Sequence, residues 1–369
     1  MNPPRTRTRR GRRSRAARAA RVPLAAVVAG ALLAAVGCSG SGSDGGTGRP
    51  AGAPGASAAA QAGVPAAGRQ APAPAAVDPA RPAADTCGNA ELSLKPPSAV
   101  PTKDSWPKAS WMEAIVQRGH IIVGVDQSSY PFGYLDPVSN SLKGFDIDLL
   151  RRVAKAVFGP DSGDERIRFR VLRNADRVPA VERGEVDIVA MTMTVNCDRR
   201  ARVDFSDIYF LAGQRALVQL DPDLPEQAKQ GLPGLAGFRV CAVNGSTSLG
   251  RIKDPKYNAK PVEGETWADC LVKLQKGETD AISTDDTILA GLQAQDPKFT
   301  AVVGERISRE PYGMAISKEH PEFVRFVNAV LAETRRDGTW RKLYDTHIGT
   351  ALGTGDAQPP AVTAWRDAS

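Results

Sequence analysis

Runs of apolar residues alternate along the C-terminal two-thirds of the chain with segments whose apolar residues recur every three or four positions. The runs at 120–125 and 238–243 are typical of buried strands, and residues 166–172 alternate as a half-buried strand does. The segments 145–158 and 266–277 have the period of amphipathic helices. Strands and helices in alternation predict an α/β fold in which helices cover parallel sheets.

A short internal repeat suggests that this pattern is built twice. "RGEVDIVAMTMT" and "KGETDAISTDDT" each close a helix and start a strand, and superposing Asp187 on Asp280 places Thr192 opposite Asp285. Helix–glycine–strand junctions are common, so coincidence is the alternative explanation. If the repeat is real, both polar clusters lie at the carboxyl end of a sheet strand, where open α/β sheets bind ligands.

The N-terminus has the order of an export signal. Nine arginines and no acidic residue occur in residues 1–37, an apolar stretch at 22–36 is too short to span a bilayer comfortably, and Gly37-Cys38 follows. A retained anchoring helix is the alternative. The segment resembles a bacterial lipoprotein signal peptide, although Ala35 stands where that pattern usually has leucine. We therefore expect a signal peptide at 1–37 and a lipid on Cys38, at the outer face of the cell membrane.

The segment 38–109 is rich in Ala, Gly, Pro and Ser and has no aromatic residue before Trp106. Such a composition cannot bury enough surface to offset the entropy of ordering, so it predicts a flexible tether. The remaining chain, about 260 residues, is long enough for a substantial core and for more than one lobe.

Charge and cysteine content narrow the function class. The chain is formally +7, but removing the nine leader arginines leaves 39 basic residues against 41 acidic ones, so the charge does not indicate nucleic-acid binding. The cysteines after Cys38 lack the paired C-x-x-C spacing of a zinc site, and outside the cytoplasm disulfides are the default. We expect no metal and no cofactor. Sequence alone leaves three pairings open among Cys87, Cys197, Cys241 and Cys270.

Several separate segments resemble one protein family. "VGVDQSSYPFGYLDPVSNSLKGFDIDLLRRVAKAVFG", "DRVPAVERGEVDIVAMTMTVNCDRRARVDFSDIYF", "VCAVNGSTS" and "GETDAISTDD" are similar to the amino-acid-binding members of solute-binding protein family 3. The cysteines and the phrases "AISTDDTILAGLQAQDP" and "RRDGTWRKLYDTHIG" are most similar to glutamate- and glutamine-binding lipoproteins of high-GC Gram-positive bacteria. The resemblance covers residues 110–349. It implies a two-lobed, periplasmic-binding-protein-like clamshell of type II, whose two hinge strands let it close on one free L-amino acid.

The resemblance also implies lobe boundaries. The hinges would fall in "YFLAGQRALV" and "EPYGMAIS", so that lobe 1 comprises residues 110–212 with 312–349, lobe 2 comprises residues 213–311, and residues 350–369 form a C-terminal tail.

With these lobes, locality favours one disulfide pairing. Cys241 ends a strand beside the helix that carries Cys270, and both lie in lobe 2, whereas Cys87 and Cys197 both lie outside it. We therefore expect the pairs Cys241–Cys270 and Cys87–Cys197.

A free amino acid brings an α-carboxylate, an α-ammonium and a side chain, and all must be satisfied once water is excluded. Arg199 can form two parallel hydrogen bonds to the α-carboxylate. A solvated surface charge is the alternative, and it is what we expect of Arg200 and Arg202. Thr192 and Thr194 would point the same way on a strand end, where their hydroxyls can serve either charged group. Ordinary strand threonines are the alternative for this pair.

Lobe 2 would contribute a second set of groups. In "NGSTSLGRI", Ser246 and Thr247 would begin a helix whose free N–H groups suit a carboxylate, although a plain helix cap gives the same pattern. Asp285 is the best candidate for the ammonium, with a helix cap as its alternative. We expect Tyr130 to pack on the ligand, with core packing as the alternative, and Asp126 to form part of the pocket wall.

Arg177 bears on which amino acid is bound. It stands just before Val178-Pro179, where a short helix would open, and the following strand leads to the threonines. In relatives that bind acidic amino acids, an arginine here is expected to hold the side-chain carboxylate. A solvated arginine at a helix start is the alternative, but a cation is unfavourable there unless an anion is near. That penalty favours a bound carboxylate, so we expect glutamate or aspartate ahead of glutamine; the margin is modest, because Asn174 nearby suits either a carboxylate or an amide.

The sequence does not favour an enzyme. Its three histidines accompany no G-x-S-x-G motif, and neither a P-loop nor a paired-histidine metal motif occurs. We expect a monomeric, lipid-anchored, extracytoplasmic binding protein that delivers an amino acid to the permease of an ABC importer and does not bind nucleic acid. A sensor that reports amino-acid levels to a membrane partner is the alternative, and a dehydratase-type enzyme on the same fold is less favoured.

Overall fold

The computed structural model describes residues 87–353, 355 and 357–366, all of which belong to the compact unit formed by residues 74–369. The expected signal peptide and Cys38 lie outside the described residues.

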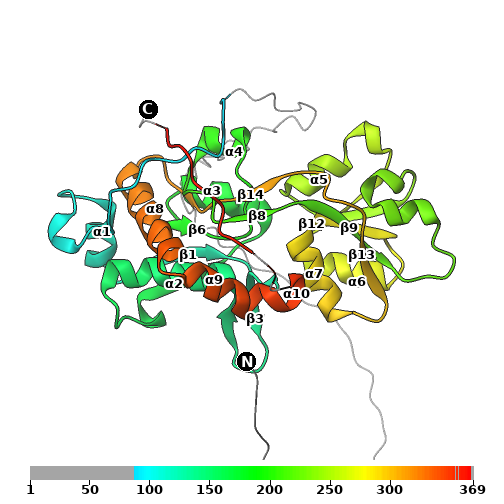
Figure 1. The fold of residues 1–369 in the computed structure, drawn as a ribbon, viewed down its shortest axis with the longest axis horizontal. Coiled ribbons are helices and arrows are strands. Elements are labelled where there is room, and N and C mark those ends of the chain that lie inside the picture. The colour runs from blue at the N-terminus through cyan, green and yellow to red at the C-terminus, as the bar shows by residue number, and fades with distance from the viewer. Residues whose placement is uncertain (1–86, 354, 356, 367–369) are drawn as a thin grey trace, which may run out of the picture. The chain divides into compact units, whose positions relative to one another are not determined.

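The first sheet has five strands in the order β5-β1-β6-β15-β7, and we call this sheet with its helices lobe 1 (Figure 1). β1 pairs in parallel with β5 and β6, whereas β15 runs antiparallel to β6 and β7. Helices α1 and α2 pack against β1, α3 against β6 and β15, and α8 against β7. The bounds are β1 Ile121–Val125, β5 Ile167–Val171, β6 Ile188–Val189, β7 Asp204–Phe205, β15 Ala315–Ile316, α1 Trp111–Arg118, α2 Phe145–Phe158, α3 Arg177–Glu182, α4 Cys197–Arg202 and α8 Pro321–Arg336.

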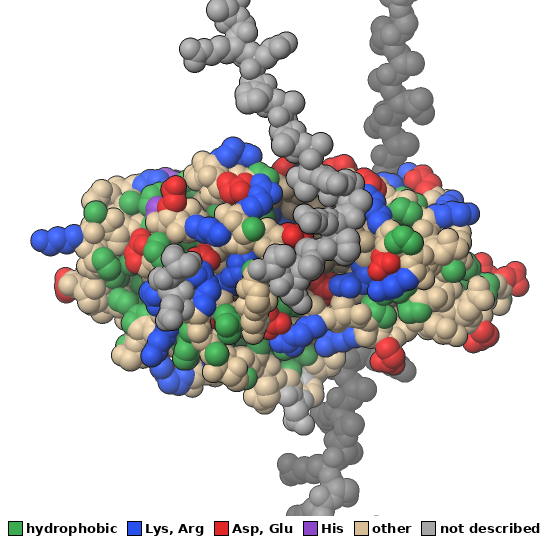
Figure 2. Space-filling view, turned by 90° about the horizontal axis from the view of Figure 1, so that it is seen from above, with side chains coloured by type: hydrophobic (Ala, Val, Ile, Leu, Met, Phe, Trp, Pro, Cys, Tyr) green, Lys and Arg blue, Asp and Glu red, His purple; other side chains and the backbone are tan. Residues whose placement is uncertain are grey.

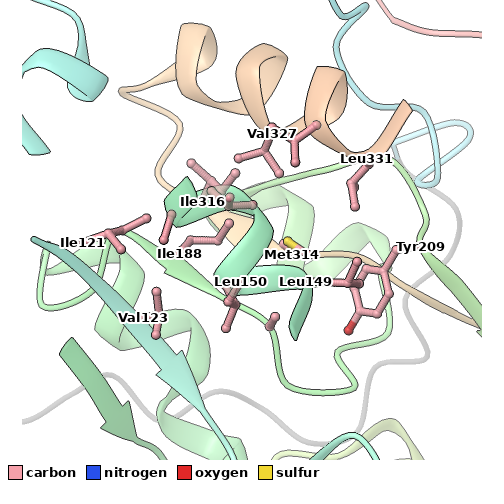
Figure 3. Close-up of a cluster of buried hydrophobic side chains, with 14 of the residues drawn as sticks. Ile121, Val123, Leu149, Leu150, Ile188, Tyr209, Met314, Ile316, Val327 and Leu331 are labelled. Carbon is pink, nitrogen blue, oxygen red and sulfur yellow. The ribbon is translucent and has the colours of Figure 1, made fainter. Parts of the chain in front are cut away.

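The core of lobe 1 joins segments that are far apart in the sequence. In Figure 3, Leu150 of α2 and Val327 of α8 lie with Ile121, Ile188 and Ile316 of three strands. The three isoleucines are fully buried, which explains why these strands are almost continuously apolar. Two of the three strands precede the second lobe in the chain and β15 follows it, so the core of lobe 1 is complete only after the chain returns.

The second sheet has the order β11-β10-β12-β9-β13, and with its helices it forms lobe 2. β10 pairs in parallel with β11 and β12, and β9 runs antiparallel to β12 and β13. Both sheets are therefore mixed and not wholly parallel as expected. In each sheet the antiparallel partner is a strand that follows a crossing from the other lobe. The bounds are β9 Gln214–Gln219, β10 Arg239–Val243, β11 Lys260–Gly264, β12 Ala281–Asp285, β13 Thr300–Val303, α5 Thr247–Ile252, α6 Trp267–Gln275 and α7 Asp286–Gln295.

Two short strands join the lobes. β8 (Phe210–Ala212) pairs antiparallel with β14 (Glu310–Tyr312), so the chain leaves lobe 1 and re-enters it through adjacent segments (Figure 1). Both strands lie within the predicted hinge segments. A pair of extended strands is a connection about which two lobes can rotate. Among the described residues, the remaining strands and α-helices are the small sheet of β2 Ser128–Ser129, β3 Gly133–Asp136 and β4 Ser141–Lys143, and the C-terminal helices α9 Thr339–Leu343 and α10 Gly349–Leu352.

The flexible tether was expected to reach residue 109, but part of residues 87–109 packs against lobe 1. Ser93 and Leu94 are each 1% exposed, and the Ser93 hydroxyl donates to the carbonyl oxygen of Phe205 at 2.7 Å. The Asn328 side chain donates to the Leu94 carbonyl at 2.7 Å. Leu94 also pairs in parallel with Arg366, so part of the C-terminal tail joins lobe 1. Average composition did not indicate these contacts, because only a few apolar and polar residues anchor an otherwise Pro-rich segment.

Both disulfides follow the expected pairing. Cys87 is joined to Cys197, and Cys241 to Cys270. No helix in the described part of the chain is long and apolar enough to cross a membrane, and the described residues hold no cluster of potential metal ligands. On the face shown in Figure 2, Lys and Arg side chains lie among Asp and Glu side chains, in keeping with the nearly balanced charge outside the leader.

Candidate ligand-binding site

A small cavity lies between the lobes, beyond the carboxyl ends of β6 and β12. Eight of the ten candidates chosen from the sequence line it, five from lobe 1 and three from lobe 2. Lobe 1 supplies Asn174, Arg177, Thr192, Thr194 and Arg199, and lobe 2 supplies Ser246, Thr247, Ser248, Trp267, Thr284, Asp285 and Ile288.

The internal repeat has a structural counterpart. Asp187 accepts the backbone N–H of Ile122 at 2.7 Å, and Asp280 accepts the backbone N–H of Arg239 at 2.7 Å. In each lobe the aspartate that precedes an inner strand thus bonds to the start of the neighbouring parallel strand. Because both strands then run towards the cavity, the same sequence pattern places polar groups at its two walls.

Arg177 is buried, with 2% of its surface exposed, so the alternative of a solvated arginine is wrong. Its Nε donates to the Asn174 carbonyl at 2.9 Å, Nη1 to the Met191 carbonyl at 3.0 Å and Nη2 to the Gly245 carbonyl at 3.2 Å. Burial, together with the charge of Arg199, lowers the pKa of Arg177 to about 9. The helix it begins, α3, starts at Arg177 itself, two residues before the proline expected to open it.

Arg199, on α4, donates to the same Gly245 carbonyl oxygen as Arg177. Its Nη1 donates to the Thr194 carbonyl at 2.6 Å and Nη2 to the Gly245 carbonyl at 3.0 Å, and burial lowers its pKa to about 10. Gly245 has φ +78°, and a Cβ there would lie 2.5 Å from the Cα of Ala175, so only glycine permits this approach of the lobes. Within the described residues, neither cavity arginine forms an ion pair with a carboxylate.

Arg200 and Arg202, which lie close to Arg199 in the sequence, differ in their exposure to solvent. Arg202 is exposed and forms an ion pair with Glu182, as expected of a surface charge. Arg200 was expected to be exposed but is 8% exposed, and its Nη1 donates to the Ala90 carbonyl. The reason is the folded segment after Cys87, which the disulfide holds against α4.

Asp285 is the buried carboxylate of the cavity. It is 4% exposed, Oδ2 accepts the Tyr312 hydroxyl at 2.6 Å, and Oδ1 has no partner among the described residues. It occupies the N-cap position of α7 without making a capping bond, so the helix-cap alternative does not explain it. Burial, with the negative charge of Glu310, raises the pKa of Asp285 to about 8. An adjacent cation would therefore relieve an unfavourable charge.

The two threonines of lobe 1 do not lie on a regular strand as expected, because β6 ends at Val189. Thr192 has φ +43°, and its N–H donates to the buried carboxylate of Asp146 at 2.9 Å. The Thr194 hydroxyl donates to Glu310 at 2.8 Å. Both side chains nevertheless line the cavity.

The four hydroxyl groups of lobe 2 that line the cavity all form hydrogen bonds. The Ser246 hydroxyl accepts the Leu249 N–H at 3.1 Å and therefore caps α5, as its alternative interpretation allowed. The Thr247 hydroxyl donates to Glu310 at 3.0 Å. The Ser248 and Thr284 hydroxyls, which the sequence did not single out, bond to each other at 3.0 Å.

Trp267 is the most important residue that the sequence analysis missed. It is 2% exposed and lines the cavity, and its Nε1–H has no partner among the described residues. It follows the N-cap Thr266 at the start of α6, a place where a core tryptophan would look the same in sequence.

Two candidates lie outside the lining. Asp126 accepts the N–H groups of Gln127 and Ser128 at 2.7 and 2.8 Å, which fixes the turn after β1. Tyr130 stacks edge-on with Tyr134, with 5.0 Å between ring centroids. Neither residue lines the cavity, although Asp126 lies near enough to Arg177 for its negative charge to act on that guanidinium and raise its pKa.

Comparison with known proteins gives the family. The sequence profile of the bacterial extracellular solute-binding proteins, family 3, matches residues 121–350, more than half of the chain. The chain belongs to this family. In this chain, two α/β lobes joined by paired strands face each other across a small cavity.

Named family 3 relatives bind amino acids. The chain is 32% identical to a glutamine-binding protein of an ABC transporter from Bacillus subtilis over 65% of this chain and 85% of that protein. It is 30% identical to a glutamate-binding protein from Corynebacterium glutamicum over 69% of this chain and 88% of that protein. Among solved structures, it matches an ancestral amino-acid-binding protein, described as a precursor of cyclohexadienyl dehydratase, with a TM-score of 0.57 and 32% identity. That match covers 64% of this chain and 99% of the other.

Proposed function

We propose that this protein captures a free acidic amino acid, L-glutamate or L-aspartate ahead of L-glutamine, for an ABC importer. The observation that carries the proposal is the imbalance in the cavity. Arg177 and Arg199 donate only to carbonyl oxygens, and Asp285 has one carboxylate oxygen without a partner. Glutamate brings two carboxylates and one ammonium, which is the complementary set.

The count of charges supports an acidic ligand over a neutral one. The charged side chains that line the cavity are the two arginines and Asp285, which sum to +1 when an ammonium beside Asp285 keeps it ionised, and nearby Glu310 is neutralised by an ion pair with Arg251 at 2.9 Å. Glutamate, with a net charge of −1, makes the cavity neutral, whereas glutamine leaves one buried positive charge. Because an uncompensated buried charge is costly, the acidic ligand is favoured.

We assign the ligand groups accordingly. Arg199 holds the α-carboxylate and Arg177 the side-chain carboxylate, each in competition with the carbonyl of Gly245, which is a weaker acceptor than a carboxylate. Asp285 holds the α-ammonium. Trp267 contributes an apolar ring and an N–H donor that has no other partner among the described residues.

The site is proposed to bind and not to catalyse, so the amino acid should be returned unchanged. The named relatives quoted above are binding proteins, and two of them carry glutamine or glutamate in their names. We further propose that residues 1–37 are an export signal, that Cys38 carries a lipid, and that the monomeric protein presents its ligand to a membrane permease.

Calorimetry across the common amino acids tests this function. Glutamate and aspartate should bind more tightly than glutamine, and basic and apolar amino acids should bind weakly or not at all. Chromatography of the recovered ligand should show only the starting compound. A preference for glutamine, or for a basic or apolar amino acid, overturns the acidic assignment, and a chemically altered ligand overturns the binding role.

A further inference from the structure

Glu310 is a buried carboxylate on the hinge strand β14, with 1% of its surface exposed. Four donors satisfy it. Oε2 accepts the hydroxyls of Thr194 at 2.8 Å and Thr247 at 3.0 Å, and Oε1 accepts Arg251 Nη2 at 2.9 Å and the Ser308 hydroxyl at 2.6 Å. The residue does not itself line the cavity between the lobes.

The two threonines come from opposite lobes. Thr194 follows β6 in lobe 1, and Thr247 begins α5 in lobe 2. One carboxylate oxygen on the hinge thus receives a hydrogen bond from each lobe. When the lobes separate, these two hydroxyls must move apart, so both bonds hold only while the lobes are together.

The direction of these two hydrogen bonds matters for a ligand. A hydroxyl has one hydrogen and two acceptor lone pairs. Since Thr194 and Thr247 give their hydrogens to Glu310, only lone pairs remain to face the cavity that both residues line. Such hydroxyls can accept hydrogen bonds but cannot donate them, and an ammonium is a group that only donates.

We propose that Glu310 is a positioning residue that fixes the hydroxyls of Thr194 and Thr247 as acceptors for the ligand ammonium and thereby couples ammonium binding to closure of the lobes. This inference rests on the proposed function, because it requires an amino acid in this cavity. Glu310 acts through the two threonines and does not touch the ligand.

Stopped-flow fluorescence tests the coupling, since Trp267 lines the cavity and reports its occupancy. In Glu310→Gln, an amide that can donate replaces an acceptor of four hydrogen bonds. L-Glutamate should dissociate about 10- to 100-fold faster, the range for hydrogen bonds to charged groups, while the association rate changes little. Thr247→Val removes one hydroxyl and should also speed dissociation. The double variant should bind L-glutamate at most about twofold more weakly than Glu310→Gln does. The two effects should not multiply, because both changes disrupt the same hydrogen-bond network.

A matched control is Glu263→Gln. Glu263 is an exposed lobe 2 carboxylate in an ion pair with Lys253, and its loss should change neither rate. Thermal unfolding of each variant separates a folding defect from a binding defect. Thr247→Val should melt as the unchanged protein does, which keeps the test valid if Glu310→Gln folds poorly.

The outcomes are distinct. Unchanged dissociation in Glu310→Gln or in Thr247→Val overturns the inference, as do effects of the two changes that multiply independently. In those cases the unchanged protein still binds glutamate, so the proposed function stands. If the unchanged protein binds no acidic amino acid, the proposed function fails and this inference fails with it.

Discussion

Under the proposed charge balance, Arg177 makes the cavity neutral with glutamate and not with glutamine, so Arg177→Leu should change the order of ligand affinities. The variant retains Arg199 and Asp285, whose charges cancel, and a ligand of zero net charge then leaves no unbalanced charge. A hydrogen bond to a charged group is worth about 1.5–3 kcal/mol. At about 1.4 kcal/mol for each factor of ten, glutamate affinity should fall roughly 10- to 150-fold. Glutamine affinity should change by less than about tenfold.

The variant also removes three donors from backbone carbonyls, so its folding must be checked. Calorimetry with glutamate, aspartate and glutamine should be paired with thermal unfolding of the same samples. Arg177→Lys keeps the charge but not the three-way contact, and it should retain the preference for glutamate at reduced affinity.

Arg173 supplies the matched control. It lies four residues earlier, is exposed and forms an ion pair with Asp176 at 2.8 Å, so Arg173→Leu should leave both affinities nearly unchanged. If Arg177→Leu weakens glutamate and glutamine by the same factor, the arginine is structural and not selective. If the unchanged protein already prefers glutamine, the charge argument is wrong.

Three further predictions concern the site and its anchoring. Arg199→Ala should weaken ligand binding in calorimetry by roughly one and a half to three and a half decades, since breaking a buried charge pair costs about 2–5 kcal/mol. Exposed Arg202→Ala should do little, and equal effects of the two changes would mean that the site is misplaced. The pKa of Asp285 is about 8 in the folded protein and near 3.8 ordinarily, so its contribution to stability is present below the ordinary pKa and is lost as pH rises towards 8. Asp285→Asn should therefore resist urea better than the unchanged, ligand-free protein at pH 9, although it no longer binds glutamate; equal or lower stability would contradict the assigned burial. Cys38→Ala should release the protein from membranes, and intact mass should show lipid only on the native form; a variant that stays membrane-bound would contradict anchoring.

Much of the fold follows from local pattern. The apolar runs at 120–125 and 238–243 match β1 and β10 to within a residue or so, and the helix expected at 145–158 has those bounds in the structure. Buried strands and amphipathic helices carry their signal in neighbouring residues, so periodicity suffices to locate them. The antiparallel strands β9 and β15 could not be assigned this way, because their direction depends on where the chain returns from the other lobe.

Site residues could be predicted from the sequence where their role depends on their place after a strand and not on contacts with distant segments. Arg199 and Asp285 come after the carboxyl ends of β6 and β12, and the sequence analysis identified both. Trp267 and Glu310 were not, because what matters for them is a contact made across the lobes or along the hinge. The left-handed backbone conformation of Thr192 could not be predicted either, since no local sequence pattern indicates it.

The order of the strands has a consequence for how the protein is made. β15 lies between β6 and β7 in the first sheet, but it is synthesised after the whole of lobe 2. On the ribosome, the first sheet therefore lacks an inner strand until residue 316 has emerged, whereas the second sheet is complete at residue 303. The lobe that is begun first is finished last. A chain truncated after residue 309 and released should carry a folded second lobe beside a first lobe that lacks an inner strand.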